Sequence, residues 1–169
     1  MEYAAIIADD LSGACDSGIK LMKCGYKTEV IINSAICNDL QGEPSCVFSV
    51  NTDSRNMSAR QAYEQVKQTV IDLKNSGVKR FYKKVDSVLR GNIGSEIDAV
   101  LDAMELDIAI VAPAFPDNGR EIIGGELWMA VENSAVAQKA SQCSAKNVIG
   151  SSMEKKLDTI SLDIVRKGE

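Results

Sequence analysis

The sequence predicts an α/β protein with three layers, in which a mostly parallel, Rossmann-like sheet carries helices on both faces. Two observations lead to this fold class. Short apolar runs at residues 3–8, 46–50, 80–82 and 107–112 are typical of buried strands, and segments with helical spacing of apolar residues separate them. This alternation of strand and helix favours parallel strands that are joined by right-handed crossovers.

The first part of the chain supplies a strand, a helix and a second strand. Residues 3–8 form the first strand, residues 12–25 form a helix that ends at Gly25, and residues 28–32 form the next strand. Residues 33–45 contain Asn, Asp, Gly and Pro, which indicates a connecting loop with at most one short turn of helix.

Two further helices are expected before residue 107. Ser58 and Gln61 have the spacing of a capping box, and the helix that they open places apolar residues on one face before it ends at Gly77. The residues of that face are Ala62, Val66, Val70 and Leu73. Residues 95–104 again show helical spacing, between the strands at 80–82 and 107–112.

The pattern weakens beyond Pro116. Residues 126–131 are expected to form a strand, residues 135–144 a short helix or a loop, residues 153–157 a helical turn, and residues 159–165 a last strand. No repeat, low-complexity tract or linker divides the chain. We therefore expect a single domain over residues 1–169, which is an ordinary domain length.

The composition argues against several classes of protein. The formal net charge is −5, whereas a nucleic-acid-binding protein normally carries a basic excess. No stretch reaches the roughly 18 apolar residues of a membrane span, and the N-terminus has no signal-peptide pattern. Five cysteines without a C-x-x-C pair indicate reduced side chains. We expect a cytoplasmic protein with no nucleic-acid or membrane partner.

The sequence contains no histidine. This removes the Ser-His-Asp and Cys-His pairs of nucleophilic catalysis, as well as histidine metal ligands. Any catalytic base is therefore Asp, Glu, Lys, Tyr or Cys, and we expect no metal ligands in the chain.

Polar clusters follow the apolar runs and predict a ligand site. Ligands of open parallel sheets bind outside the carboxyl ends of the strands, so these clusters should converge on one cleft. Asp9 and Asp10 follow the first run, and neighbouring side chains on a strand point to opposite faces. One of the two, Asp10 on the simplest interpretation, caps the following helix, and the other is available to bind a hydroxyl or accept a proton.

Basic residues follow the next two runs. The segment around Arg55 has the composition of a simple turn, but a guanidinium at a strand end also suits a bidentate contact with a carboxylate or phosphate. Lys83 and Lys84 should point to opposite faces of their strand. We expect one of these lysines in the cleft, and the other over a helix or in solvent.

The densest polar segment lies between a strand and a helix, at residues 86–96. Its glycines permit close backbone approach, and the helix start offers free amides to an anion. A polar loop with Asn92 or Ser95 as helix cap explains the glycines, but it does not explain why Asp86 and Arg90 occur with Lys84. Arg120, which follows a proline-containing loop, is one further candidate.

These side chains suggest the chemistry of the ligand. Cations suit an acid group and carboxylates suit hydroxyls, which predicts a small hydroxy acid. No G-x-x-x-x-G-K-[ST] phosphate loop is present, and no G-x-G-x-x-G turn follows the first strand. The chain is thus expected to have no nucleotide site of its own.

Four motifs make this prediction more specific. They are ADDLSGA at residues 8–14, NTDSR at 51–55, YKKVDSVLRGN at 82–92, and APAFP at 112–116 with Gly119 and Arg120. In this order they resemble the sugar-binding N-terminal domain of the four-carbon acid sugar kinases, which include D-threonate, D-erythronate and 3-oxo-tetronate kinases. The resemblance covers nearly the whole chain and weakens after about residue 125.

The resemblance implies ATP-dependent phosphorylation of a tetronate, with Mg²⁺ on the phosphates. It implies that a C-terminal domain binds the nucleotide, in cis or in a partner chain. Because the sequence ends at Glu169, we expect that this domain is absent and that the chain alone is inactive. The small-molecule partner is an acid sugar, and a homo-oligomer is left open.

The resemblance and the polar clusters together give the expected substrate-binding residues, which are Asp9, Asp10, Ser12, Arg55, Lys83, Lys84, Asp86, Ser87, Arg90, Gly91, Asn92 and Arg120. Arg90, Lys84 and Arg55 are expected to hold the carboxylate of the substrate. Asp10 and Asp86 are expected as the catalytic side chains, which hold or deprotonate hydroxyls, and the general base is not assigned.

The chain departs from the family pattern at several positions. Ser12 and Val88 stand where threonine is usual; serine keeps the hydroxyl and valine loses it. Residues 132–146 lack the usual family sequence, so a substrate contact from that loop is not expected. An alternative function is a non-catalytic acid-sugar-binding or regulatory protein with the same fold.

Overall fold

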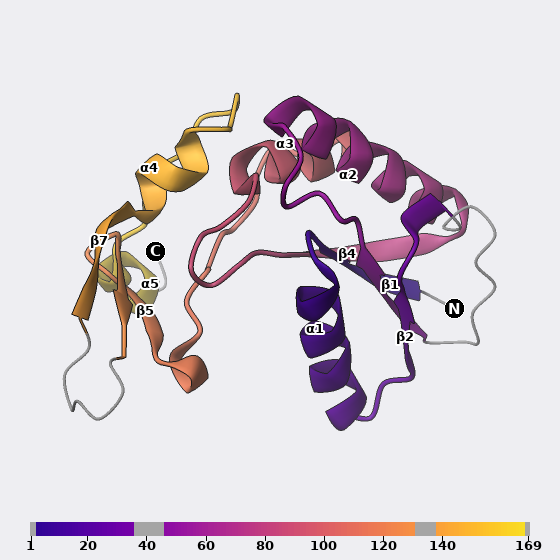
Figure 1. The fold of residues 1–169 in the computed structure, drawn as a ribbon, viewed down its shortest axis with the longest axis horizontal. Helices are drawn as coiled ribbons and strands as arrows, with labels where there is room; N and C mark the ends of the chain where they lie inside the picture. Colours follow the sequence, from indigo (N-terminus) through magenta and orange to yellow (C-terminus); the bar gives the residue numbers. More distant parts are fainter. Residues whose placement is uncertain (1–2, 36–45, 131–137, 168–169) are drawn as a thin grey trace.

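The computed structural model describes residues 3–35, 46–130 and 138–167, and these form two sheets (Figure 1). The larger sheet has four parallel strands in the order β2-β3-β1-β4. Its strands are β1 (Tyr3–Ala8), β2 (Thr28–Ile31), β3 (Val47–Asn51) and β4 (Val78–Lys84). Helix α1 (Leu11–Lys23) covers one face, and α2 (Ala59–Asn75) and α3 (Ile93–Met104) cover the other. We call these elements the parallel lobe, and they confirm the predicted fold class.

The core of the parallel lobe lies between the sheet and α2. Ile7, Phe48 and Val50 of the two central strands are almost completely buried there. The predicted apolar face of α2 meets them, since Ala62, Val66, Val70 and Leu73 have no solvent exposure. Each large apolar side chain buried in this way contributes roughly 1.5–3 kcal/mol. Helical periodicity in α2 therefore identified the main packing surface correctly.

The ends of the helices follow local sequence rules. The capping box of α2 is present, with both the Ser58 side chain and the Gln61 side chain in place. Gly25 and Gly77 follow α1 and α2 with φ angles of 90° and 95°, which glycine adopts without steric cost. Of the two caps considered for α3, Asn92 occupies the N-cap position, although its side chain makes no capping hydrogen bond.

The second sheet is antiparallel and was not predicted as a unit. It contains β5 (Arg120–Ile123), β6 (Glu126–Met129) and β7 (Gln138–Ser144), and α4 (Ala145–Gly150) follows it. Gly124 and Gly125 both have positive φ and form the two-residue turn between β5 and β6. We call this sheet, the short 3-10 helix η2 (Pro116–Asn118) and α4 the antiparallel lobe.

A second core joins the two lobes through α3. Ile93, Ile97 and Leu101 of α3 pack with Leu127 of β6 and Ile149 of α4. The two helices approach closely, because a Cβ atom at Gly94 would collide with the carbonyl oxygen of Ile149 and lie 2.8 Å from Met153 Cβ. Helix α3 therefore packs against both lobes.

The strand predicted at residues 107–112 is wrong. The segment lies between α3 and η2 without strand structure, and Ile108 and Ile110 are 79% and 88% exposed. Val111, on the opposite side of the chain, packs against the second core. Val111 is thus buried by packing against the second core and needs no place in the parallel sheet. High β propensity alone therefore does not make this segment a strand beside β4.

Three other predictions near the C-terminus are also corrected. The described part of residues 135–144 is strand β7, and residues 153–157 are not helical. Residues 159–165 are not a strand either, because α5 (Leu162–Lys167) occupies their second half. Ile160, Ile164 and Val165 are exposed, so these residues have no buried face that would favour the two-residue alternation of a strand. The strand expected at 126–131 is present as β6.

None of the helices in the described ranges combines the length and the apolar character that a membrane crossing requires.

The close contact between α3 and α4 gives a test of how the lobes are joined. Substituting Gly94→Ala should lower the free energy of unfolding by roughly 1–3 kcal/mol, because the added methyl group overpacks the contact. Gly150→Ala is the matched control, since its Cβ would meet only Leu157 Cδ2 at 3.8 Å. Urea unfolding measures both variants. Equal stability of the two would contradict the close approach of α3 and α4.

Candidate functional site

A cleft of about 580 Å³ lies at the carboxyl ends of β1 and β4. One wall is formed by α1 and by the loop after β4, and the other by residues 112–120, at the start of the antiparallel lobe. Of the expected site residues, eight line this cleft: Asp10, Ser12, Arg55, Lys84, Asp86, Ser87, Arg90 and Arg120. The clusters predicted from separate parts of the sequence therefore do converge.

Arg55 is the centre of the charged groups in the cleft. Its Nε and Nη2 donate to Asp9 Oδ2 and Oδ1 at 2.8 and 3.0 Å, and its Nη1 donates to Asp10 Oδ2 at 2.7 Å. Nη2 also lies 3.6 Å from Asp86 Oδ1. The hydrogen bonds to Asp9 raise the pKa of Arg55. Most of the donor capacity of this guanidinium is thus used within the protein.

Asp9 and Asp10 have different roles, but these roles are not divided as the sequence suggested. Asp9 is buried and holds Arg55 in a bidentate ion pair behind the cleft wall. Asp10 lines the cleft, and its Oδ1 accepts from the Gly13 backbone N–H at 2.8 Å as the N-cap of α1. Asp10 therefore combines the two roles that the sequence left open for the pair: it caps the helix and faces the cleft.

Asp86 and Arg90 form a second ion pair within one loop. Asp86 Oδ2 accepts from the backbone N–H and Nε of Arg90 at 3.1 and 2.9 Å, and Oδ1 accepts from Nη2 at 2.9 Å. Burial alone would raise the pKa of Asp86, but hydrogen bonds and charge from Arg90, with Arg55 nearby, lower it to about 2. Asp86 is accordingly a stable anion and a weak base.

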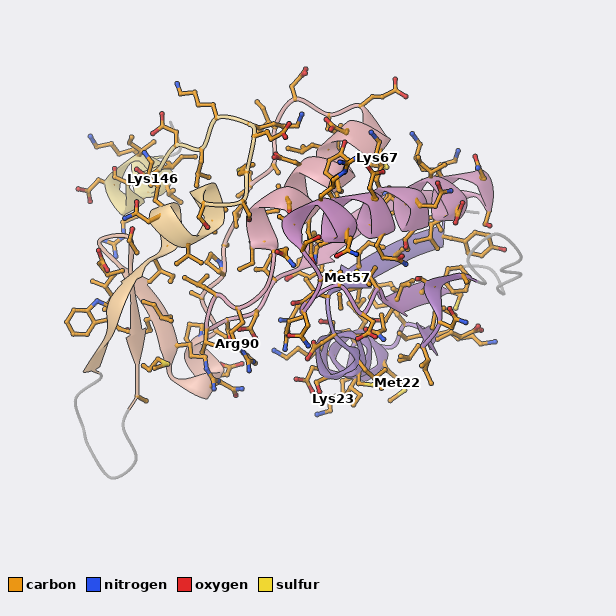
Figure 2. The ribbon with its side chains drawn as sticks, turned by 45° about the horizontal axis from the view of Figure 1, so that its top comes forward. Met22, Lys23, Met57, Lys67, Arg90 and Lys146 are labelled. Atoms are coloured by element: carbon orange, nitrogen blue, oxygen red, sulfur yellow. The ribbon has the colours of Figure 1, made fainter. Side chains whose placement is uncertain are left out.

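The loop between Asp86 and Arg90 adopts a strained backbone. Leu89 has φ of 63°, which costs a non-glycine residue roughly 1–3 kcal/mol. Its side chain is buried in the second core with Ile93 and Leu127, and this packing offsets the strain. The position of Arg90 is therefore linked to the core that joins the lobes. Figure 2 shows Arg90 between α1 and the antiparallel lobe.

Lys83 and Lys84 point to opposite faces, as the sequence predicted. Lys83 forms a buried ion pair with Glu96 of α3 at 2.7 Å, away from the cleft. Lys84 lines the cleft, and its Nζ donates to the Val85 carbonyl oxygen at 2.6 Å. Burial lowers the pKa of Lys84, while the nearby Asp86, Asp9 and Asp10 oppose that change. Within the described ranges Lys84 has no carboxylate in ion-pair contact.

Gly91 and Asn92 support the cleft from behind and do not line it. A Cβ atom at Gly91, where φ is 87°, would lie 2.8 Å from Asp9 Oδ2, so only glycine fits beside the Asp9–Arg55 pair. The Asn92 side chain donates to the carbonyl oxygens of Ser54 and Met57 and fixes the loop that carries Arg55. Both residues, like Asp9 and Lys83, hold other residues of the site in place.

Sequence reasoning missed several residues that line or support the cleft. Asp16 and Lys20 line it together with Ser12, and these three residues follow one another at four-residue intervals along α1. That spacing places them on one helix face and could have identified them. Glu96 was also missed: it is 1% exposed and accepts from Ser54 Oγ at 2.6 Å in addition to pairing with Lys83.

The carboxylates of the cleft do not fit a metal site. Asp9, Asp10 and Asp86 each accept hydrogen bonds from a guanidinium, whose positive charge neutralises the carboxylates and repels a metal cation. In the part of the chain that the structure describes, no group of three or more acidic or thiol side chains is arranged to hold a metal ion.

Comparison with known proteins agrees with this arrangement. A family model described as a sugar-binding N-terminal domain matches residues 4–169. The D-erythronate kinase of Heliobacterium modesticaldum is 40% identical over 128 residues, which is 75% of this chain and 29% of the relative. The D-threonate kinase of Bordetella bronchiseptica is 39% identical over 132 residues, which is 75% of this chain and 32% of the relative.

A solved structure shows the same fold. It is a protein from Bordetella bronchiseptica, described as a domain of unknown function with bound citrate in a domain-swapped dimer. It is similar to this chain with a TM-score of 0.74 and 32% sequence identity, over 88% of this chain and 40% of the solved one.

The parallel lobe, its charged cleft and the matching family model define a sugar-binding N-terminal domain. The chain belongs to the four-carbon acid sugar kinase family. Its matched residues span 29–32% of the length of these two curated relatives.

The low pKa of Asp86 predicts a pH-dependent contribution to stability. Its folded pKa of about 2 is below the ordinary 3.8, so the ion pair with Arg90 stabilises the fold above about pH 4 and this contribution is lost as the pH falls through about 2. Asp86→Asn should therefore cost about 2 kcal/mol at pH 7, and the difference from wild type should shrink towards pH 2.

Urea unfolding at several pH values measures this difference. Asp117→Asn, which removes an exposed carboxylate of η2, is the control and should change stability little at any pH. A cost for Asp86→Asn that stays constant between pH 7 and pH 2 would show that charge pairing is not its origin.

Proposed function

We propose that residues 1–169 form the acid-sugar-binding domain of an ATP-dependent kinase for a D-threonate, D-erythronate or 3-oxo-tetronate type of substrate. The nucleotide would be bound by a further domain, in the same chain or in a partner. Family membership supports this proposal, as do curated relatives with kinase names that extend well beyond the matched region. A solved relative holds citrate, which is itself a hydroxy acid.

The observation that carries the proposal is the state of Lys84. Arg55 and Arg90 are paired with carboxylates of the cleft, while Lys84 is half-buried beside them and donates only to a neutral carbonyl. A partly desolvated ammonium without an anionic partner attracts the carboxylate of a ligand strongly. We assign the carboxylate of the substrate to Lys84, with Arg90 at the edge of the cleft as its second contact.

This assignment changes the role of Arg55. The guanidinium was expected to bind substrate, but its donors are directed at Asp9 and Asp10. We assign Arg55 to positioning: its hydrogen bonds fix the directions of the two aspartates. A cluster that is already arranged in this way loses little conformational freedom when the substrate binds.

Asp10 and Asp86 are assigned to the hydroxyl groups of the substrate. Both line the cleft, and each oxygen that accepts one hydrogen bond retains a second lone pair for a hydroxyl donor. The low pKa of Asp86 makes it a hydrogen-bond acceptor and a poor proton acceptor. Between the two expected catalytic side chains, Asp10 is therefore the better candidate to accept the proton.

The proposed reaction is an in-line phosphoryl transfer. The substrate hydroxyl oxygen forms a bond to the γ-phosphorus of ATP, the bond from that phosphorus to the β–γ bridging oxygen breaks, and ADP leaves. The hydroxyl proton passes to Asp10 or to water. The contribution of this chain is to hold the acceptor hydroxyl in place, which is a major part of catalysis in such reactions.

Substitution of Lys84 tests the assignment of the carboxylate. Lys84→Met keeps the length and apolar stem of the side chain but removes its charge, so the Kd for D-erythronate and D-threonate should rise at least tenfold. Isothermal titration calorimetry on the chain measures it. Lys79→Met removes an exposed charge from the same strand outside the cleft and should leave the Kd unchanged.

Two outcomes would contradict the proposal. Unchanged affinity in Lys84→Met would remove this lysine from the site, and no binding of any tetronate to the wild type would remove the substrate class. ATP turnover distinguishes a kinase from a non-catalytic binding protein, because only the kinase forms ADP in proportion to substrate. This turnover is measured with a bound tetronate, in the protein that includes the nucleotide-binding domain.

A further inference from the structure

Two cations at the mouth of the cleft are not used by the proposed substrate contacts. Lys20 projects from the last part of α1, and Arg120 stands at the start of β5, so they come from opposite walls. Both line the cleft. Within the described ranges, neither is in ion-pair contact with a carboxylate: Lys20 lies over an aromatic ring and Arg120 Nη1 donates to the Asn118 carbonyl oxygen at 3.3 Å.

Phe115 brings these two side chains together. Lys20 Nζ lies 3.7 Å from the centroid of the Phe115 ring, a cation–π contact that fixes the ammonium without neutralising it. Phe115 and Arg120 form an isolated antiparallel bridge, with their backbone groups hydrogen-bonded at 2.8 and 3.1 Å. Side chains directly opposite each other in such a bridge lie on the same face. Lys20, Phe115 and Arg120 thus form one group, which we call the mouth cluster.

The backbone around the mouth cluster is well defined. Pro116 opens η2 directly after Phe115, and Gly119 turns the chain back with φ of 64°. The Asn118 and Gly119 N–H groups donate to Phe115 and Pro116 carbonyl oxygens at 3.0 and 2.7 Å. This tight turn returns the chain to Arg120 beside Phe115, so the arrangement is built into the loop and does not depend on a ligand.

The charge of the cleft is unevenly distributed. Towards the strand ends, Arg55 and Arg90 are paired with the carboxylates Asp9, Asp10 and Asp86, and Lys84 lies beside them with its Nζ donating to a carbonyl oxygen. At the mouth, two cations face one acidic side chain among the lining residues, Asp16. A ligand that carried a monoanionic carboxylate to Lys84 and a second, more highly charged group to the mouth would match this distribution.

The size of the cleft leaves room for such a group. Cavities of roughly 300–1,000 Å³ hold drug-sized ligands, and a four-carbon sugar acid is much smaller than that, whereas this cleft measures about 580 Å³. A phosphate group carries up to two charges and several acceptor oxygens, and a guanidinium beside an ammonium provides matching donors.

We propose that the mouth cluster is a phosphate-binding subsite, separate from the carboxylate contact at Lys84. It deepens the proposed function, on which its biological role rests: it would hold the phosphate at the stage of transfer, either as the terminal phosphate of the nucleotide or as the phosphate monoester of the product. Lys20 and Arg120 act on the same group from both walls, so an occupied subsite also holds the walls together.

Titration of inorganic phosphate into the 169-residue chain, followed by phosphorus NMR, tests the subsite directly. Lys20→Met removes the charge and keeps the apolar stem over Phe115, so the Kd for phosphate should rise roughly tenfold, the cost of one charge-assisted hydrogen bond. Arg120→Gln should have a similar effect. Lys20→Arg keeps a cation over the ring and should restore most of the affinity.

Lys23→Met is the matched control. Lys23 lies three residues further along α1, is exposed, and does not line the cleft (Figure 2). Its substitution changes the net charge by the same amount and should leave the Kd for phosphate unchanged. An equal loss in Lys20→Met and Lys23→Met would mean that phosphate responds only to the overall charge, which overturns the proposal.

The source of the phosphate is distinguished by two further ligands. If Lys20→Met raises the Kd for ATP alone, the subsite holds the nucleotide. If it raises the Kd for a phosphorylated D-erythronate alone, the subsite holds the product. Either result supports the proposal, and unchanged affinity for both ligands and for inorganic phosphate overturns it.

Competition with D-erythronate separates this proposal from the proposed function. Phosphate should bind equally well in the presence of saturating D-erythronate, and displacement of one by the other would show that the two cations serve the carboxylate site instead. If no tetronate binds but phosphate affinity still depends on Lys20, the assigned substrate is wrong and the phosphate subsite stands.

Discussion

The ion pairs of Arg55 are the interaction on which the rest of the site depends. Arg55 follows β3, Asp9 and Asp10 follow β1, and Asp86 follows β4, so one guanidinium connects the ends of three adjacent strands. Further bonds hold the same ends together, since Thr52 and Arg55 donate their backbone N–H groups to the carbonyl oxygens of Ala8 and Asp9. The carboxyl edge of the sheet is thereby a fixed arrangement of charges before any ligand binds.

Partial burial of these charges costs free energy, and this cost explains why other residues are needed to support them. Partly buried charges are stabilised only when their remaining donors and acceptors are satisfied, and removal of one partner leaves an uncompensated charge. Gly91 gives Asp9 and Arg55 the space to meet, and Asn92 fixes the loop that carries Arg55. On the other face of β4, Lys83, Glu96 and Ser54 form a second satisfied network that attaches the same loop to α3. These residues do not line the cleft themselves, and they hold in place the residues that do.

The sequence was sufficient to predict the parallel lobe because the patterns of its strands, of its helix cap and of its polar strand ends all indicate the same fold. Strand runs such as residues 3–8 are fully apolar, the capping box at Ser58 marks α2, and polar residues at each strand end identify the cleft. The opposite directions of Lys83 and Lys84 followed from the strand period alone. What could not be derived was which charges neutralise one another: Arg55 has the same local sequence whether it contacts a ligand or, as here, three aspartates.

The antiparallel lobe could not be predicted for a different reason. Strands β5 and β6 are only four residues long, which gives a weak pattern. Residues 107–112 and 159–165, outside this sheet, have the alternation of a strand but no buried face that would favour one. The Gly124-Gly125 pair, where both residues have positive φ, is a local signal of the hairpin. Lys20 was missed because a lysine near the end of a helix has many ordinary explanations, and its significance comes only from Phe115, which is 95 positions away in the sequence.

The position of the antiparallel lobe has a consequence for the site. Its first residues form one wall of the cleft, and its core meets α3 through Ile93, Ile97 and Leu127. The same core buries Leu89 and so determines the strained loop that aims Arg90 and Asp86 at the cleft. A change in how this lobe packs on α3 would therefore move the mouth cluster and Arg90, while the contacts of Arg55 with Asp9 and Asp10 stay fixed at the strand ends. The two ends of the cleft are held by different cores, and the distance between them depends on helix α3.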